Sequence, residues 1–340
     1  MNHSTASSAE SDKGMALILP PARVAVVIVN WNGYSYLSRC LQALQQQTVI
    51  DFHAIVVDNA STDGSAELVP ALEDLRFTLV RMETNQGFAR ANNLAVTQWA
   101  SAPWVALLNP DAFPAPDWLE QLLAAADLNP GVAAFGCTLV DASDPALLDG
   151  TGDCYHLSGR AFRRDHGHSR VLRVRAAGEI FAPCAAAAMY LRSVWIDAGG
   201  LDEDYFCYME DVDFGFRLRL RGYKCWHVPD AVCFHVGSAI TGRRSDFSIY
   251  HGQRNLVWTY VKNMPGILFW LFLPLHLLAN FLALAWFSLR GNSAVVWRAK
   301  HHALRSLPKY WRKRRVIQAS RIATVRCIWA QLDKSFWPQP

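Results

Sequence analysis

The sequence predicts an α/β fold, with a Rossmann-like and mostly parallel sheet flanked by helices, followed by a C-terminal helical region. Three observations support this prediction. Short β-branched runs alternate with helix-like stretches over residues 23–108, which is the pattern of βαβ units. Polar clusters stand where the predicted strands end, and residues 267–289 carry no charge. With 340 residues, the chain is long enough for one large domain or two ordinary ones.

The first strand and helix are the clearest elements. Residues 23–30 (RVAVVIVN) form a continuous β-branched run, as expected of a parallel strand buried on both faces. Residues 34–47 then have helical spacing, and residues 52–58 (FHAIVVD) predict a second strand, followed by a turn and another helix. The same alternation continues with a strand at residues 77–82, a helix at residues 87–99 and a strand at residues 104–108.

Polar clusters follow three of these strands, at residues 30–33, 58–63 and 109–111. Ligands of parallel sheets bind beyond the carboxyl ends of the strands. Pro110 stiffens its turn and holds Asp111 at the sheet edge, where a carboxylate suits a hard divalent cation, although Asn-Pro-Asp is also an ordinary turn. Asp58 is placed to accept a hydrogen bond from a nucleotide base or ribose. The alternative is that it caps the turn after its strand. Neither GxGxxG after the first strand nor GxxxxGK[ST] occurs, which argues against a dinucleotide-binding Rossmann domain and a P-loop enzyme.

Residues 149–170 are Gly-rich, polar and basic, and predict a hairpin or an irregular excursion of the kind that serves as a lid. We expect its histidines, His156, His166 and His168, to be exposed rather than to ligate metal. Small residues dominate residues 183–191, which suits either a close backbone approach or ordinary packing.

Residues 205–235 hold the acidic groups with the strongest chemical signal. Glu210, Asp211 and Asp213 open a helical pattern, and a strand-like run at residues 230–235 ends in His235. If that run folds back across the helix, a carboxylate and an imidazole converge, as a general base and a metal ligand require. The alternative is that acids favour the first helical turn, with Asp213 and Arg217 forming an i,i+4 pair.

The C-terminal region combines an apolar stretch with a basic one. Residues 267–289 are long enough to cross a bilayer at about 1.5 Å per residue, and residues 290–334 hold twelve Lys or Arg and one acid. A single span would separate the basic tail from the catalytic part, against the positive-inside rule. We therefore expect a re-entrant hairpin bent near Pro274 or an interfacial helix, with residues 295–326 facing anionic lipid. Core helices packed on the α/β domain are the alternative. Nucleic acid is not an expected partner, because the apolar stretch would have no use there.

Cysteine usage and the N-terminus complete the organisation. The eight cysteines show no CxxC pair, which is typical of reduced thiols in a cytosolic protein. The first residues are polar and Ser-rich, without the apolar core of a signal peptide. We predict a disordered tail at residues 1–22, an α/β domain at residues 23–245 and a membrane-associating helical region at residues 246–340.

Taken in order, the motifs resemble the family 2 glycosyltransferases. The chain reads VVIVNWNG, VVDNASTDGS, NQGFARANN, LLNPDA and GGLDEDYFCYMEDVDFGFRLRLRGY, and a histidine follows within about fifteen residues. Within that family it is similar to the rhamnosyltransferases that build bacterial cell-surface polysaccharides. The resemblance covers residues 23–237 and implies the GT-A fold.

The resemblance also implies roles for matching residues. Asp211 matches the general base, beside Glu210, although spacing alone leaves Glu210, Asp211 and Asp213 open. Asp111 matches the last acid of the DxD motif, and His235 matches the histidine that completes the metal site in some members. The residues implied to bind the nucleotide sugar are Asn30, Asn32, Asp58, Asn85, Asn92 and Asn109, of which Asn109 replaces the first acid of DxD.

The implied reaction is a metal-dependent (Mg²⁺ or Mn²⁺) and inverting sugar transfer. A dTDP- or UDP-sugar, with rhamnose implied only by the resemblance, would donate to a lipid-linked or lipopolysaccharide-type glycan at the cytoplasmic face of the inner membrane. One base without a second nucleophile predicts inversion. A sugar-phosphate nucleotidyltransferase is an alternative, but the basic, Gly-rich loop that it needs is missing from VNWNGYS. An inactive membrane scaffold is a third reading, against which Asp111 and Asp211 are both present.

Overall fold

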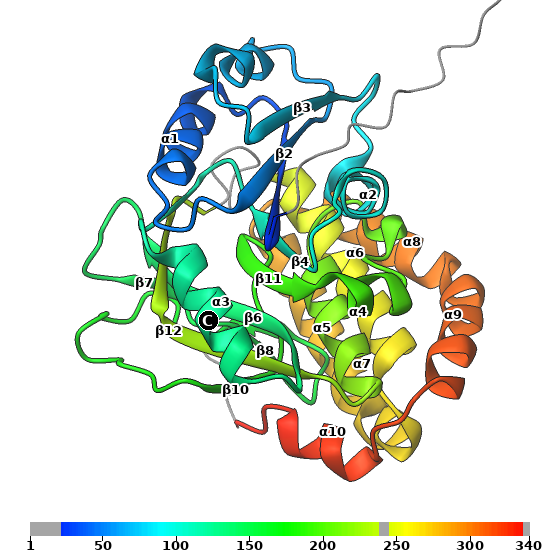
Figure 1. The fold of residues 1–340 in the computed structure, drawn as a ribbon. Helices are drawn as coiled ribbons and strands as arrows, with labels where there is room; N and C mark the ends of the chain where they lie inside the picture. Colours follow the sequence, from blue (N-terminus) through cyan, green and yellow to red (C-terminus); the bar gives the residue numbers. More distant parts are fainter. Residues whose placement is uncertain (1–21, 238–244, 336–340) are drawn as a thin grey trace, which may run out of the picture.

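The computed structural model describes residues 22–237 and 245–335, so the predicted disordered tail lies almost entirely outside the described residues. Its centre is a mixed sheet of ten strands. Eight of them lie in the order β10-β12-β6-β11-β4-β1-β2-β3, and the other two are β5, which pairs with β12, and β7, which pairs with β6. Helices pack on the sheet, and the C-terminal helices form a group at one side (Figure 1). The predicted α/β fold is confirmed.

The first half of the sheet is parallel, as expected. It contains β1 (Val24–Asn30), β2 (Phe52–Asp58), β3 (Phe77–Arg81) and β4 (Trp104–Leu108). Alternate residues of β1 belong to two different cores, one shared with α1 (Tyr34–Gln45) and the other with α2 (Gly87–Leu94). Burial on both faces explains why β1 and β2 are apolar throughout.

Two helical predictions in this half were wrong in detail. After β2 the chain forms only short 3₁₀ turns, Ser65–Leu68 and Pro70–Leu72, because Pro70 has no N–H to continue a helix. The helix predicted over residues 87–99 is α-helical only to Leu94 and continues as a π turn, Ala95–Trp99.

The second half of the sheet is mixed. β11 (Ala187–Leu191) runs antiparallel to both β4 and β6 (Val132–Asp141) and so joins the halves. β12 (Lys224–His235) lies parallel to β6. It begins six residues before the strand predicted at residues 230–235. The remaining elements here are β5 (Ala112–Pro114), α3 (Trp118–Leu128), β7 (Leu148–Gly150), the hairpin β8 (Asp153–Tyr155) and β9 (Ala161–Arg163), β10 (Gly178–Ile180), α4 (Arg192–Asp197), the 3₁₀ turn η4 (Glu203–Tyr205) and α5 (Glu210–Leu220).

Five helices complete the described chain: α6 (Asp246–Asn263), α7 (Gly266–Leu289), α8 (Ser293–Arg305), α9 (Leu307–Ala319) and α10 (Val325–Gln331). The predicted boundary at residue 246 falls where α6 begins. These helices nevertheless share one hydrophobic core with the α/β part, formed by Tyr155, Phe181, Tyr205, Phe216, Tyr260, Phe269 and Tyr310 among others. The α/β part therefore buries apolar surface against these helices.

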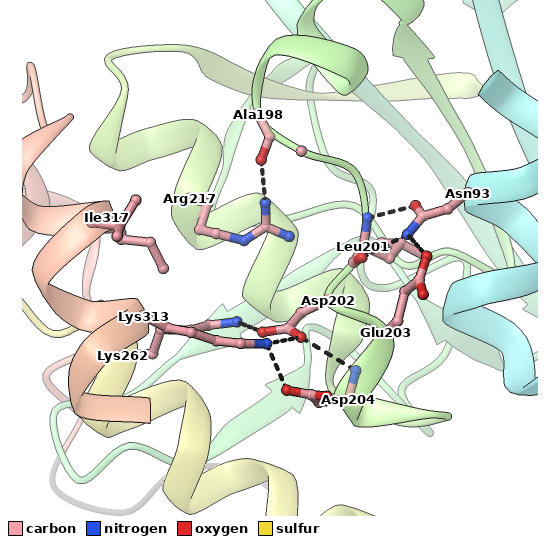
Figure 2. Close-up of a pocket in the computed structure, with 12 residues that line it drawn as sticks. Asn93, Ala198, Leu201, Asp202, Glu203, Asp204, Arg217, Lys262, Lys313 and Ile317 are labelled. Carbon is pink, nitrogen blue, oxygen red and sulfur yellow. Dashed lines mark hydrogen bonds and ion pairs between the residues drawn. The ribbon is translucent and has the colours of Figure 1, made fainter. Parts of the chain in front are cut away.

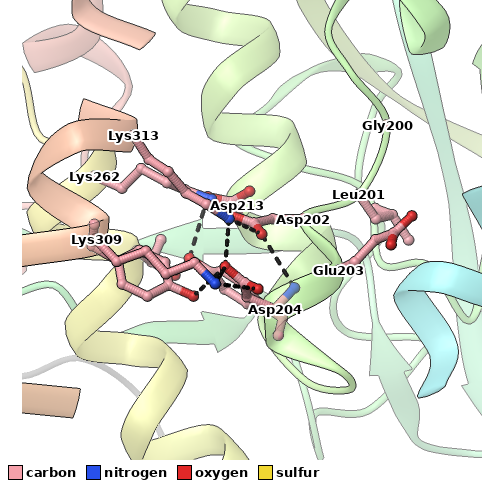
Figure 3. A network of polar contacts seen from close by, with 12 residues as sticks. Gly200, Leu201, Asp202, Glu203, Asp204, Asp213, Lys262, Lys309 and Lys313 are labelled. Atoms are coloured by element: carbon pink, nitrogen blue, oxygen red, sulfur yellow. Dashed lines mark hydrogen bonds and ion pairs between the residues drawn. The ribbon is translucent and has the colours of Figure 1, made fainter. Parts of the chain in front are cut away.

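A network of ion pairs fastens the C-terminal helices to the segment before α5 (Figure 3). Lys262 of α6 is buried, with its Nζ 2.5 Å from Asp202 and 2.7 Å from Asp213. Lys313 of α9 lies 2.5 Å from Asp202 and 2.7 Å from Asp204. Residues 295–326 were predicted to form an amphipathic basic surface for anionic lipid, and some of their cations instead contact the protein. Besides Lys313, the internal cations are Lys300, whose ammonium donates to the Gln253 carbonyl, and Arg314, whose guanidinium donates to the Val261 and Met264 carbonyls.

Helix α7 is the one described helix that is long and apolar enough to cross a membrane, judged by length and composition alone. Only 17% of its most apolar window is buried within the protein. It is continuous through Pro274, so the predicted hairpin at that residue was wrong. Because α9 packs back against the α/β part, α7 does not separate the two as a single span would. The interfacial helix, and the alternative of helices packed on the α/β domain, both stay predictions.

Candidate active site

A cavity of about 870 Å³ opens where β1, β2, β4 and β12 end, a size typical of ligand sites. This is the sheet edge at which α/β folds bind their ligands. The polar, charged and aromatic residues that line it include Trp31, Asn59, Asn85, Asn109, Asp111, Asp149, Asp153, Arg163, Cys184, Glu210, Asp211 and His235.

Asp111 and His235 meet in this cavity, as predicted for the metal ligands. β5 and β12 pair directly, with Ala112 opposite His235. The two side chains are nearly fully buried, and Nε2 of His235 lies 3.5 Å from Oδ1 of Asp111. On the other side of the ring, Nδ1 of His235 donates to Oδ2 of Asp149 at 2.8 Å.

These residues fit a divalent cation. Within the described residues, Nε2 of His235 is buried without a hydrogen-bond partner, although such atoms are normally satisfied. Its neighbour Nδ1 is fixed by a carboxylate, which is how metal-binding histidines are commonly oriented. Burial disfavours the imidazolium, but Asp111 and Asp149 outweigh this effect and raise the pKa of His235. The pocket thus favours positive charge where a cation would lie.

The three acids at the start of α5 have different surroundings. A carboxylate oxygen of Asp211 accepts from the Ala185 N–H at 3.1 Å, and its residue is partly exposed to the cavity. Glu210 also lines the cavity but is buried, and burial together with Asp211 raises its pKa well above the usual range. A neutral Glu210 is a poor base at neutral pH.

Asp213 points away from the cavity into the protein. It is fully buried and pairs with Arg217 at 2.9 Å and with Lys262 at 2.7 Å. Burial favours its neutral acid, but Lys262 and Arg217 together lower its pKa. The helical i,i+4 pair that the sequence offered as an alternative is therefore present for Asp213, whereas Asp211 remains available for chemistry.

A second group of ligand-type atoms lies beside Asp211. Carboxylate oxygens of Asp153 and Asp211 and the Cys184 sulfur lie within 4.8 Å of one another. Burial raises the pKa of Cys184 well above its usual range, and the Arg163 guanidinium lies 2.9 Å from the same sulfur. A protonated thiol next to a guanidinium makes a poor cation site. Asp111 and His235 are the better candidates.

Four residues predicted to bind the nucleotide are not among those that line the cavity. The Asn30 amide donates to Asp58 at 3.1 Å, so both side chains are engaged beneath the turn after β2. Oδ1 of Asn32 accepts from the Thr62 N–H at 2.8 Å, and the Asn92 amide donates to a carbonyl in its own helix. Oδ2 of Asp58 accepts from the Ser61 N–H at 3.3 Å, which matches the capping alternative, and its contact with nucleotide stays a prediction.

Asn85 and Asn109 do line the cavity. Asn85 accepts from the amide of Asn59 at 3.0 Å, and Asn59 in turn accepts from the Gln86 N–H at 2.8 Å. Asn59 was missed in the sequence, although it follows Asp58 at a strand end. Because amides can donate to and accept from a base or ribose, Asn59 and Asn85 are the better-placed pair.

β7 and the β8–β9 hairpin contribute residues that sequence reasoning did not single out: Asp149, Asp153 and Arg163. Their only signal in the sequence was the predicted lid-like excursion at residues 149–170. His156 was expected to be exposed but is buried, bonded to Ser158 and the Ser335 carbonyl. Long-range pairing through β7, β8 and β9 brings the three acidic or basic side chains to the cavity.

A second hollow, of about 460 Å³, lies between α2, α9 and the loop before α5 (Figure 2). Asp202, Lys262 and Lys313 line it, and each is engaged in the ion pairs described above. The Arg217 guanidinium donates to the Ala198 and Gly200 carbonyls. Because its charged side chains are already paired with one another, this hollow is part of the contact between the helices.

The mixed sheet with a cavity at its edge is the architecture of GT-A glycosyltransferases. Residues 25–195 match Glycosyl transferase family 2, and the chain belongs to that family. The family-level prediction is therefore confirmed, and the chain is a glycosyltransferase.

Relatives and solved structures agree with this assignment. The chain is 29% identical over 246 residues to the N-acetylglucosaminyl-diphospho-decaprenol L-rhamnosyltransferase of Mycobacterium tuberculosis (strain ATCC 25618 / H37Rv), covering 64% of this chain and 77% of that protein. A mannosyltransferase from Pyrobaculum calidifontis in complex with GDP-Man and Mn²⁺ matches with a TM-score of 0.54 and 20% identity, over 92% of this chain and 88% of that one. TarS of S. aureus in complex with UDP-GlcNAc matches with a TM-score of 0.56 and 16% identity, over 88% and 91%. At these identities the structures support the fold.

Proposed function

We propose that this enzyme is an inverting, metal-dependent glycosyltransferase that moves a sugar, rhamnose in our proposal, from a dTDP- or UDP-sugar to a lipid-linked glycan. One observation carries the proposal. The Asp111–His235 pair and the Asp211 carboxylate, from distant parts of the sequence, line the same cavity.

The donor half of the site would hold the nucleotide diphosphate. Asp111 and His235 would bind Mg²⁺ or Mn²⁺, with Asn109 beside them, and a bound cation would stabilise charge on the departing diphosphate. Arg163 is the only Lys or Arg that lines the cavity within the described residues. Its guanidinium pairs with Asp149 and lies near Asp153, so it balances part of the negative charge of the cavity. Trp31, Asn59 and Asn85 would then face the nucleoside.

The acceptor half would be organised by Asp211. Its Oδ2 is oriented by the Ala185 N–H, which leaves the carboxylate able to take the proton of an acceptor hydroxyl. The hydroxyl oxygen then attacks the anomeric carbon as the bond to the diphosphate breaks. A single displacement inverts the anomeric configuration. Asp153 is no competing nucleophile, because burial and Asp211 raise its pKa to about 8 and keep it neutral at pH 7.

A membrane-bound acceptor agrees with the exposed face of α7. The relative named above acts, by its name, on a sugar linked to diphospho-decaprenol. The exposed apolar side chains of α7 include Ile267, Trp270, Leu271, Leu277, Leu278, Phe281 and Leu282. Exposed Arg290 and Arg298 follow them. An apolar face flanked by cations binds an anionic bilayer surface, so we place α7 in the interface at the cytoplasmic face of the inner membrane.

The test is a donor screen on the full chain. Melting is followed with dTDP or UDP, each with Mn²⁺ or Mg²⁺, and nucleoside diphosphate release is measured with the matching dTDP- or UDP-rhamnose. We expect stabilisation by one nucleotide that is lost in EDTA and in Asp111→Ala.

Asp211→Asn should keep that stabilisation and lose turnover by about 10²–10⁴-fold. Asp230→Asn, at an exposed carboxylate of β12, serves as the matched control. If no nucleotide stabilises the wild-type chain with or without metal, the proposal fails.

A further inference from the structure

Asp153 is a buried carboxyl without a hydrogen bond to its side chain among the described residues. It lines the cavity and is only 7% exposed. Its nearest cation is Arg163, whose Nε lies 3.9 Å away, beyond hydrogen-bond distance. Its oxygens are not among the fully buried atoms that lack a partner, so the carboxyl stays open to a ligand that enters the cavity.

The position of Asp153 is fixed, so the missing contact does not come from a loose loop. Its backbone N–H donates to the Ala182 carbonyl at 2.8 Å, and it pairs with Arg163 across the β8–β9 hairpin. The Arg163 guanidinium is held in turn by Asp149 and by the Cys184 sulfur. The carboxyl is therefore held at the cavity wall by strand pairing on both sides.

Asp153 stands next to the proposed base. Its carboxylate oxygen is within 4.8 Å of one from Asp211. Two acids at this separation do not both ionise readily, and the more buried one keeps its proton. A protonated carboxyl both donates and accepts a hydrogen bond, so it is suited to a neutral hydroxyl. A diphosphate accepts hydrogen bonds but donates none, and the neighbouring carboxylates would repel its negative charge.

We propose that Asp153 binds a second hydroxyl of the acceptor sugar, adjacent to the one that Asp211 deprotonates. The enzyme would thus select a pyranoside with two neighbouring hydroxyls. This inference rests on the proposed function, since Asp211 must be the base. Asp153 is then a specificity-determining residue of the acceptor site and takes no part in donor binding.

The test compares Asp153→Ala and Asp153→Asn with the wild type. The probe acceptor is N-acetylglucosaminyl diphosphate on a short prenyl chain, together with analogues that each lack one ring hydroxyl. In Asp153→Ala we expect the acceptor KM to rise about tenfold, while kcat and the donor KM change less than about twofold. Asp153→Asn, which preserves a neutral donor and acceptor, should restore most of the affinity.

The deoxy analogues make the test specific. The analogue that lacks the hydroxyl bound by Asp153 should react equally well with the wild type and Asp153→Ala, whereas the other analogues should keep the difference. An unchanged acceptor KM in Asp153→Ala, or an equal loss with every analogue, overturns the inference. Nucleotide stabilisation of each variant shows that it is folded. If the wild type binds no nucleotide, it is the proposed function that has failed.

Discussion

The metal site gives the sharpest prediction, because Asp149 contacts the proposed ligand His235 at Nδ1, whereas Asp111 lies on the Nε2 side of the ring. Asp149 is buried, accepts from Nδ1 of His235 at 2.8 Å and pairs with Arg163. Burial favours its neutral acid, but Arg163 with His166 and His235 lowers the pKa of Asp149 well below its usual range. Asp149→Asn keeps the shape and one acceptor oxygen while removing the negative charge.

The expected loss is in cation affinity. A carboxylate behind a ligating histidine fixes its tautomer and increases its basicity, and its removal costs about 10- to 100-fold in metal affinity. That range corresponds to about 1.4–2.7 kcal/mol. Mn²⁺ binding, measured by electron paramagnetic resonance with the nucleotide present, should weaken by this factor. Asp230→Asn, on the same strand as His235 but exposed, should bind Mn²⁺ like the wild type.

The result that would refute this reasoning is an Mn²⁺ affinity within about twofold of wild type in a folded Asp149→Asn variant. His235 would then not be a ligand, or its orientation would not depend on Asp149. A second check is Asp111→Asn, which removes the opposite carboxylate at 3.5 Å and should weaken binding at least as much. If Asp111→Asn also had no effect, the cation would have to lie elsewhere in the cavity.

Three further predictions concern stability and membrane binding. Lys262→Met leaves Asp202 and Asp213 without their shared buried partner, so the free energy of unfolding from chemical denaturation should fall by about 3 kcal/mol or more. Lys309→Met, at an exposed lysine, should lower it by less than about 1 kcal/mol. Equal losses in the two variants would contradict the importance of the buried pairs. Because burial and Asp211 raise the pKa of Asp153 to about 8, its contribution to stability is complete below about pH 4 and declines as the pH rises through about 8. The melting temperature of Asp153→Asn relative to wild type should therefore rise from pH 5 to pH 8, and a constant difference would contradict this. Leu278→Glu on α7 should reduce cosedimentation of the protein with vesicles that contain phosphatidylglycerol. Leu75 is an exposed apolar residue of the α/β part, and Leu75→Glu should not reduce it. Equal binding of both variants would argue against α7 as the membrane contact.

Local patterns were sufficient for the parallel half of the sheet. The runs at β1, β2 and β4 are apolar because both faces are buried, and their signal does not depend on the rest of the chain. Asp111 and Asp211 stood out for related reasons, one at a strand end and one at a helix start. The sequence could not separate Asp211 from Asp213. That distinction depends on Lys262, which is 49 residues beyond Asp213 and reaches it only in the fold.

The site residues of β7, β8 and β9 could not be predicted, for a similar reason. Asp149, Asp153 and Arg163 have no periodicity, and three-residue strands give almost no pattern. In the basic C-terminal region, the sequence predicted a lipid-facing role for residues that the fold partly buries. Its cations looked alike in sequence, but Lys300 and Arg314 are buried and donate to backbone carbonyls. Whether a cation faces lipid or protein is decided by tertiary packing.

The C-terminal helices also shape the active site, which gives them a role besides membrane contact. Phe206, Tyr208 and Met209 line the cavity with positive φ angles of 65°, 68° and 71°, a conformation that non-glycine residues adopt at a cost of about 1–3 kcal/mol each. Asn255 of α6 is fully buried and its amide donates to the carbonyls of residues 205, 207 and 208. This strained turn leads directly into Glu210 and Asp211. Since α6 holds the turn and α7 follows α6 after a two-residue connection, the surface proposed to meet the membrane and the support of the proposed base belong to one packed unit.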